Sequence, residues 1–154
     1  MKKDMFVIFF DVDGVLNKKS DWGNKYSIDK DCVKIFGDIV KYYRKYYAEV
    51  RLIICSTWRA GLTNNGTGLD SSQIINLQDA LKSIGLLISD KTPVSNKSRQ
   101  EEIEYYIRRN SISDYLVVDD DKSLYPNADK INLYCPDYLT GLTKKDYKNI
   151  RKYF

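Results

Sequence analysis

The first apolar segment of the chain reads Phe6-Val7-Ile8-Phe9-Phe10, and Asp11-Val12-Asp13-Gly14-Val15-Leu16-Asn17 follows it directly. A run of β-branched and aromatic residues that ends in carboxylates and a glycine is typical of a buried strand carrying acidic side chains to its C-terminal edge. Ligands bind at that edge in open α/β sheets, and Gly14 permits the turn that keeps the loop open. The segment therefore predicts an α/β protein with a ligand site at Asp11 and Asp13.

Length and composition limit the class of protein. A chain of 154 residues fits a single domain, residues 1–154, that can bury a core without disulfides or metal staples. Its 43% hydrophobic and 30% charged residues are ordinary for a soluble globular protein. The net charge of +4 permits a polyanionic partner without requiring one.

The cysteine and histidine content excludes several chemistries. Cys32, Cys55 and Cys135 have no C-x-x-C spacing, so we expect neither disulfides nor zinc, and a reduced, cytoplasmic setting. The first apolar run is too short to span a membrane, and no targeting signal is recognisable. The chain has no histidine, which removes Ser-His-Asp and Cys-His mechanisms. Acid–base chemistry must then come from carboxylates, lysine or tyrosine.

The rest of the chain alternates predicted helices and strands. A helix that begins near Ser27 or Asp29 carries apolar residues at three- and four-residue intervals as far as Tyr47. We expect further helices from Ser71 or Ser72 to Gly85, over 98–109, and from Thr143 onward. Strands are predicted at 51–55, 86–88, 115–118 and 131–134, with loops at 17–27, 61–70 and 90–96. This alternation predicts a Rossmann-like, doubly wound and mainly parallel sheet with helices on both faces.

Polar residues follow three of the predicted strands. They are Asp11 and Asp13, Ser56 and Thr57, and Asp119 and Asp120. The C-terminal ends of parallel strands lie side by side, so we expect these side chains to share one pocket. Several carboxylates there would repel one another without a cation, and an all-oxygen set favours Mg²⁺. Asp121 is the residue expected to cap the next element.

The motifs resemble those of the haloacid dehalogenase superfamily of phosphohydrolases. The resemblance rests on Asp11-Val12-Asp13-Gly14-Val15, on Ser56 after its strand, on a basic residue at Lys97 or Arg99, and on Asp119-Asp120. The segments Ser56-Thr57-Trp58-Arg59, Arg99 to Ile103 and Gly141-Leu142-Thr143 further resemble a small, cap-poor subgroup. The order and context of the motifs match over nearly the whole chain.

The resemblance implies a Mg²⁺-dependent phosphomonoesterase. Asp11 would attack phosphorus and form an aspartyl-phosphate, and Asp13 would act as general acid and base. Mg²⁺ would be held by Asp11, the backbone carbonyl of Asp13, Asp119 and Asp120. Ser56, with Thr57 beside it, would bind the phosphoryl group, and Lys97 or Arg99 would neutralise its charge.

The substrate is open at this point. The chain has no room for a large cap, and in this superfamily an open site implies access for a bulky substrate, such as a nucleic-acid end or a phosphoprotein. The alternatives are a phosphorylated metabolite or nucleotide, or a non-catalytic binding module on the same fold.

Three features have alternative interpretations. The D-x-D-G motif does not fit a calcium loop, because Val15 and Trp22 occupy ligand positions. Trp58 is expected to pack in the core, and Arg59 either anchors its loop or reaches phosphate. The basic and aromatic segment 41–47 is expected to be a helix with a core stripe of Tyr43 and Tyr47 rather than a nucleic-acid contact.

Overall fold

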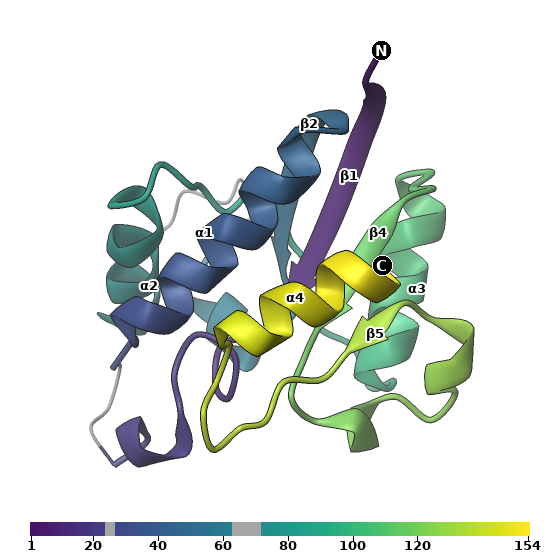
Figure 1. Ribbon diagram of the computed structural model, residues 1–154. Helices are drawn as coiled ribbons and strands as arrows, with labels where there is room; N and C mark the ends of the chain where they lie inside the picture. Colours follow the sequence, from purple (N-terminus) through teal and green to yellow (C-terminus); the bar gives the residue numbers. More distant parts are fainter. Residues whose placement is uncertain (24–26, 63–71) are drawn as a thin grey trace.

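The computed structural model describes residues 1–23, 27–62 and 72–154. Five parallel strands form one sheet in the order β3-β2-β1-β4-β5 (Figure 1). Their bounds are β1 Lys3–Phe10, β2 Tyr47–Ile54, β3 Asp90–Lys91, β4 Tyr115–Val118 and β5 Leu133–Tyr134. The predicted Rossmann-like parallel sheet is confirmed, with β1 at its centre.

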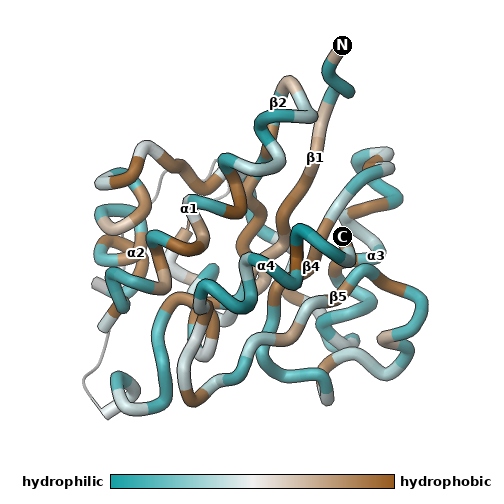
Figure 2. The backbone as a smooth tube through the Cα atoms, in the orientation of Figure 1, coloured by the Kyte–Doolittle hydropathy of each residue, from teal (hydrophilic) through white to brown (hydrophobic). Residues whose placement is uncertain are grey.

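The central strand supplies core residues to both faces of the sheet. Phe6, Ile8 and Phe10 belong to one buried cluster, whereas Val7 and Phe9 belong to the other. This division follows from the two-residue period of a strand, and it explains why the segment is apolar at every position. Figure 2 shows the hydrophobic character of β1 between more polar surface elements.

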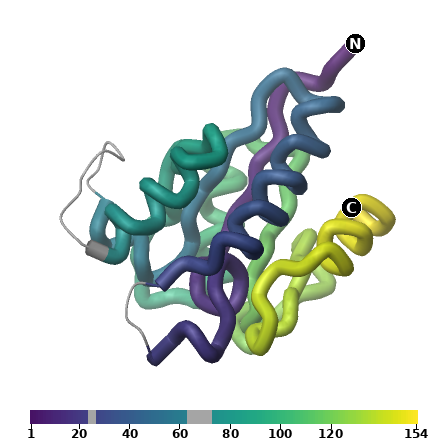
Figure 3. Tube along the Cα trace, turned by 60° about the vertical axis from the view of Figure 1, so that its left-hand side comes forward, coloured from purple at the N-terminus to yellow at the C-terminus, as the bar shows by residue number. Residues whose placement is uncertain are grey.

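Helices cover both faces, as expected for a doubly wound fold. The first cluster includes residues of α1 (Lys30–Arg44), α2 (Ser72–Lys82) and α4 (Lys144–Tyr153), whereas α3 (Arg99–Arg109) belongs to the second. Figure 3 shows α1 beside α4 on the same side of the sheet. In the described connections lie four short 3-10 helices: η1 Lys19–Asp21, η2 Thr57–Gly61, η3 Lys122–Leu124 and η4 Ala128–Lys130.

The predicted helix starts agree with the caps. The side chain of Asp29 accepts hydrogen bonds from the backbone of Asp31 and Cys32 at the start of α1. Ser98 caps α3, and Thr143 forms a capping box with Asp146 at α4. Each of these side chains satisfies backbone N–H groups that have no partner within the helix.

Several expected boundaries are wrong. Tyr47 does not extend α1 but opens β2, because the strand pairs with β1 from Lys3 opposite Tyr47 onward. No strand forms at 86–88; it forms instead at 90–91, within the expected 90–96 loop, because Asp90 pairs with Ile53. The last strand covers only 133–134 of the predicted 131–134.

Three expectations fall partly outside the described residues, the first being the predicted 17–27 loop, of which residues 24–26 are not described. The predicted 61–70 loop is described only at Gly61 and Leu62, and α2 begins at Ser72 in the described part of the chain.

None of the helices seen across residues 1–23, 27–62 and 72–154 combines the length and apolar character that crossing a bilayer requires.

Candidate active site

The ends of β1, β2 and β4 lie next to one another at one edge of the sheet. The hydrogen bonding continues just past the strands: Asp11 N donates to Val118 O at 2.9 Å, and Cys55 N donates to Phe10 O at 3.0 Å. These bonds fix the point at which the loop that follows β1 leaves the sheet; we call this loop, residues 11–17, the β1 loop. Three polar segments distant in sequence are therefore held at one place.

Three carboxylates gather there. Asp11, Asp119 and Asp120 each offer an oxygen, and these oxygens lie within 4.8 Å of one another. Asp11 and Asp119 are buried and Asp120 is half-buried. Hard oxygen donors at this spacing fit a divalent cation such as Mg²⁺.

Burial makes these carboxylates costly to ionise together. Burial raises the pKa of Asp11 well above its usual range, the charge of Asp119 raises it further, and Arg99 opposes both effects. Burial likewise raises the pKa of Asp120 to about 6, and the neighbouring Asp119 contributes to the rise. A bound cation would remove this penalty, because it favours the charged form of each ligand.

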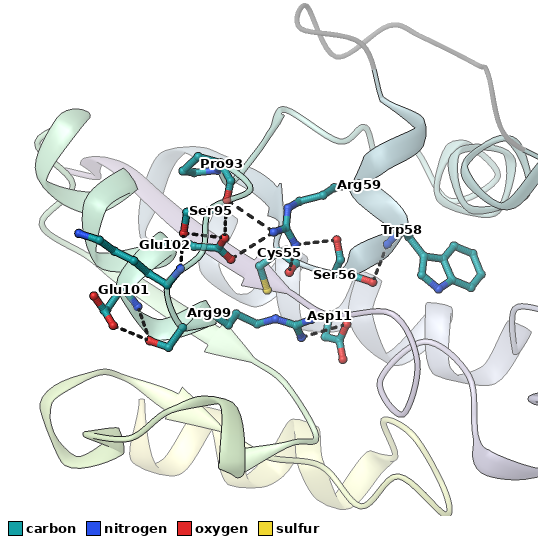
Figure 4. A network of polar contacts seen from close by, with 12 residues as sticks. Asp11, Cys55, Ser56, Trp58, Arg59, Pro93, Ser95, Arg99, Glu101 and Glu102 are labelled. Carbon is teal, nitrogen blue, oxygen red and sulfur yellow. Dashed lines mark hydrogen bonds and ion pairs between the residues drawn. The ribbon is translucent and has the colours of Figure 1, made fainter.

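Arg99 is the basic side chain that the fold brings to the carboxylates. Its Nη1 donates to Asp119 Oδ2 at 2.8 Å and lies 3.4 Å from Asp11 Oδ1. Arg99 is the first residue of α3, so its side chain extends from the helix start toward the ends of β1 and β4 (Figure 4). Lys97, two residues earlier, is exposed and lines a different cavity of about 450 Å³ beside Glu101 and Tyr105.

Asp119 is held by two further donors. The hydroxyl of Tyr125 donates to its Oδ2 at 2.7 Å, and the backbone N of Asp121 donates to its Oδ1 at 3.1 Å. Asp121 itself accepts from Ser123 N and caps η3, as predicted. The fully buried Asp119 carboxylate therefore has a fixed orientation.

Asp13 is fixed by two side chains, one from its own loop and one from η2. Asn17 Nδ2 donates to Asp13 Oδ1 at 2.9 Å, and the indole Nε1 of Trp58 donates to Asp13 Oδ2 at 3.1 Å. The Oδ1 atom of Asn17 accepts hydrogen bonds from Gly14 N and from Trp22 Nε1, each at 3.0 Å. Asn17 thus connects the β1 loop internally, and Trp58 connects it to η2.

Ser56 and Thr57 begin the segment after β2. Ser56 is buried, and its Oγ accepts a hydrogen bond from Trp58 N at 3.1 Å, so it caps η2. Thr57 is exposed. Both lie in the connection that follows the strand next to β1, on the side of the sheet edge that carries Asp11.

The side chain of Arg59 anchors the segment that joins β2 to η2. Its Nη1 donates to the carbonyls of Cys55 and Ser56 at 2.7 and 2.9 Å, and its Nη2 lies 3.1 Å from Glu102 Oε1. Glu102 in turn accepts from Ser95 N at 2.6 Å. Both partners of the ion pair are buried (Figure 4). Of the two interpretations of Arg59, the structure supports the loop anchor.

The sequence reasoning missed four residues that orient the site: Asn17, Tyr125, Glu102 and, in its polar role, Trp58. Trp58 is buried as expected, but packing alone did not indicate its bond to Asp13. The motif that contains Asp13 also contains Asn17 four residues later, a local signal that could have been used. Tyr125 and Glu102 had no such signal, because their partners lie on other elements.

The parallel sheet and the acidic edge agree with the fold class and site position expected from the resemblance to the haloacid dehalogenase superfamily. Over residues 7–147 the chain matches the family model described as the HAD domain in Swiss Army Knife RNA repair proteins, and it belongs to this family. No curated protein and no solved structure gave a significant match.

Proposed function

We propose that this chain is a Mg²⁺-dependent phosphomonoesterase that removes the terminal phosphate of a nucleic acid through an aspartyl-phosphate at Asp11. The observation that carries the proposal is the position of Asp11: a buried carboxylate 3.4 Å from the guanidinium of Arg99 and within 4.8 Å of the carboxylates of Asp119 and Asp120. A nucleophile, a positive charge and a candidate cation site thus lie together.

The residues divide the reaction between them. Asp11 attacks phosphorus while Asp13 gives a proton to the leaving oxygen, so that the bond from phosphorus to that oxygen breaks. Asp13 then takes a proton from water, which attacks phosphorus and releases inorganic phosphate from Asp11. Asn17 and Trp58 support both steps by holding the Asp13 carboxylate in one orientation.

Charge neutralisation is the second requirement, because a phosphate and a carboxylate nucleophile repel each other. Arg99 supplies a fixed positive charge, and Ser56 supplies a hydroxyl for a phosphoryl oxygen. Mg²⁺ held by Asp11, the Asp13 carbonyl, Asp119 and Asp120 would keep the carboxylates ionised and draw charge from the phosphoryl oxygens.

The substrate class rests on two observations. The connections between β1 and α1 and between β2 and α2 span only residues 11–29 and 55–71, which leaves no length for a large cap over the site. The family description refers to RNA repair proteins. An open site in such a family favours a phosphorylated RNA end over a small metabolite.

The test compares the wild-type protein with Asp11→Asn on a panel of phosphomonoesters. The panel contains an aryl phosphate, 3′- and 5′-phosphorylated oligoribonucleotides, nucleotides and sugar phosphates, each with Mg²⁺ and with a chelator. We expect Mg²⁺-dependent release of phosphate, fastest from an oligoribonucleotide and abolished in Asp11→Asn. Preference for sugar phosphates would contradict the substrate class, and the absence of hydrolysis throughout would indicate a non-catalytic binding module.

A further inference from the structure

Two exposed aromatic rings stack on each other beside the β1 loop. Trp22 follows η1, and Tyr138 lies in the connection between β5 and α4. The ring centroids are 5.9 Å apart with an interplanar angle of 26°. Trp22 keeps 43% and Tyr138 keeps 42% of its surface exposed, so the pair leaves aromatic surface open to solvent.

Hydrogen bonds connect this pair to the catalytic residues. The indole Nε1 of Trp22 donates to Asn17 Oδ1, and the same amide donates from Nδ2 to Asp13 Oδ1. The ring of Trp22 is therefore separated from the proposed general acid by one amide group and two hydrogen bonds. Because Asn17 is buried, its amide is fixed in place and orients the Trp22 ring.

Backbone contacts also hold the segment that contains Tyr138 against η1 and the β1 loop. Lys19 N donates to Tyr138 O at 2.9 Å, and Leu142 N donates to Val15 O at 3.0 Å. Gly141 packs so closely that a Cβ atom there would lie 2.7 Å from Asn17 O. The two segments thus form a single surface next to the site.

A positive charge lies over the same surface. The exposed Lys19 has its Nζ 5.7 Å from the centroid of the Tyr138 ring. A flat aromatic surface with an adjacent cation suits a nucleobase of a nucleic acid, since the base can stack while a phosphate other than the one at Asp11 meets the charge.

We propose that Trp22 and Tyr138 form a stacking site for a nucleobase of the substrate whose phosphate is attacked by Asp11. This inference rests on the proposed function and specifies the ligand: a phosphomonoester that carries a base. Base stacking tolerates any sequence, because every base has an aromatic face.

A second surface of the protein is also aromatic and basic, and it serves as a control for the surface formed by Trp22 and Tyr138. A cavity of about 610 Å³ is lined by Lys2, Lys3, Tyr43, Tyr46 and Tyr47, among others. It lies where β1 begins, whereas Asp11 follows the end of this eight-residue strand. At roughly 3.3 Å per residue, about 25 Å separates the two ends. A nucleotide bound in that cavity could not present its own phosphate to Asp11.

Tryptophan fluorescence can test the stacking site without turnover. Trp22 and Trp58 are the two tryptophans of the chain, and Trp58 is buried. The variant Asp11→Asn/Trp58→Phe therefore leaves Trp22 as the only indole and prevents attack on phosphorus. We would titrate this protein, with Mg²⁺ present, with a phosphorylated oligouridylate, uridine monophosphate and glycerol phosphate.

We expect saturable quenching by the two ligands that carry a base and none by glycerol phosphate. In the same background, Tyr138→Leu should weaken binding of the oligouridylate by roughly 5- to 150-fold, the range for loss of one stacked aromatic ring. Tyr46→Leu, in the comparison cavity, should leave the Kd unchanged. Thermal unfolding of each variant checks that it is folded.

Comparing the Kd of the oligouridylate with that of uridine monophosphate distinguishes a polynucleotide substrate from a mononucleotide substrate. Tighter binding of the oligouridylate identifies a polynucleotide end, and equal binding identifies a mononucleotide; both support a stacking site. No quenching by either base-bearing ligand overturns it, as does a Kd that changes with Tyr46→Leu but not with Tyr138→Leu. Because binding is measured without hydrolysis, a chain that stacks bases but hydrolyses nothing contradicts the proposed function alone.

Discussion

Gly14 lies directly against the carboxylate of Asp120: a Cβ atom on Gly14 would be 2.4 Å from Asp120 Cγ. Its backbone also has a φ of +79°, a conformation that residues with a side chain rarely adopt. The glycine of the β1 loop therefore does more than permit a turn. It leaves the space in which Asp120 approaches Asp11.

Gly14→Ala should disturb the cation site and the fold together. The strained φ should cost about 1–3 kcal/mol of unfolding free energy, and displacement of Asp120 should weaken Mg²⁺ binding by at least roughly tenfold. Calorimetric titration with Mg²⁺ and denaturant unfolding measure the two effects. Gly23→Ala is the control, because a Cβ there meets nothing within 4 Å. Equal Mg²⁺ affinity in both variants would contradict a role for Asp120 in the site.

Trp58→Phe should lower kcat with little change in KM. The substitution keeps an aromatic ring in the core but removes the N–H that donates to Asp13 Oδ2. A hydrogen bond to a charged group is worth about 1.5–3 kcal/mol, which corresponds to roughly a 10- to 100-fold loss in kcat.

Steady-state kinetics on an aryl phosphate measure this change. Tyr47→Phe is the matched control, because it removes a hydroxyl bonded to Asp114 at the opposite end of the sheet and should leave kcat unchanged. A Trp58→Phe enzyme with wild-type kcat would show that Asp13 does not depend on this contact.

Arg99→Met and Lys97→Met should show which of the two basic residues proposed from the sequence neutralises the charge of the phosphoryl group. Arg99 contacts Asp11 and Asp119, so its loss should reduce kcat/KM by roughly 10²- to 10³-fold, as for other removed charge-stabilising donors. The exposed Lys97 should be replaceable within about threefold on the same scale. Phosphate release from an aryl phosphate measures both, and the reverse order would assign the phosphate-binding role to Lys97.

Arg59→Met should destabilise the protein much more than Arg51→Met. Arg59 and Glu102 are both buried, and removal of one partner leaves an unpaired charge, at a cost of about 3–5 kcal/mol. Arg51 forms an ion pair of similar length with Glu49, but both side chains are about half exposed, so its loss should cost less than about 1 kcal/mol. Urea unfolding compares the two variants, and similar costs would contradict the anchoring role of Arg59.

The free energy of unfolding of the metal-free protein should fall as the pH rises from about 4 to 6. In the folded state the pKa of Asp120 is about 6, above its ordinary value of 3.8, so the folded protein binds more protons than the unfolded chain between these values. The stabilising contribution is complete below 3.8 and is lost as pH increases through about 6.

Mg²⁺ should therefore raise Tm more at pH 7.5 than at pH 5, because its ligands must be deprotonated. Differential scanning calorimetry with Mg²⁺ or a chelator at both pH values measures the effect. Asp120→Asn should reduce the difference between the two pH values, and Asp11, whose pKa is also raised, accounts for what is left. An equal rise in Tm at both would argue against carboxylate ligation.

The sequence by itself determined the fold and the place of the candidate site. The apolar run 6–10 is local and unambiguous, and side chains that follow parallel strands must meet at one edge. This reasoning predicted the sheet, which is confirmed, and the approach of Asp11 to Asp119 and Asp120. The chemical roles of these residues stay predictions.

Boundaries that depend on pairing were not predictable in this way. Tyr47 fits the period of the preceding helix, yet pairing with Lys3 places it in β2. Likewise the apolar segment 86–88 has strand propensity, but β3 forms at 90–91, where the backbone aligns with Ile53. Tertiary context outweighs local propensity where an element is short.

Only the tertiary structure decided how the site is supported. Arg99 rather than Lys97 reaches the carboxylates because α3 begins at Arg99 and is oriented by its packing on β1. Asp13 is held by Trp58, Asp119 by Tyr125 and Arg59 by Glu102, all pairs that join different segments of the chain. Such partners cannot be predicted from the local sequence, because the contacts form only after the sheet and its helices have packed.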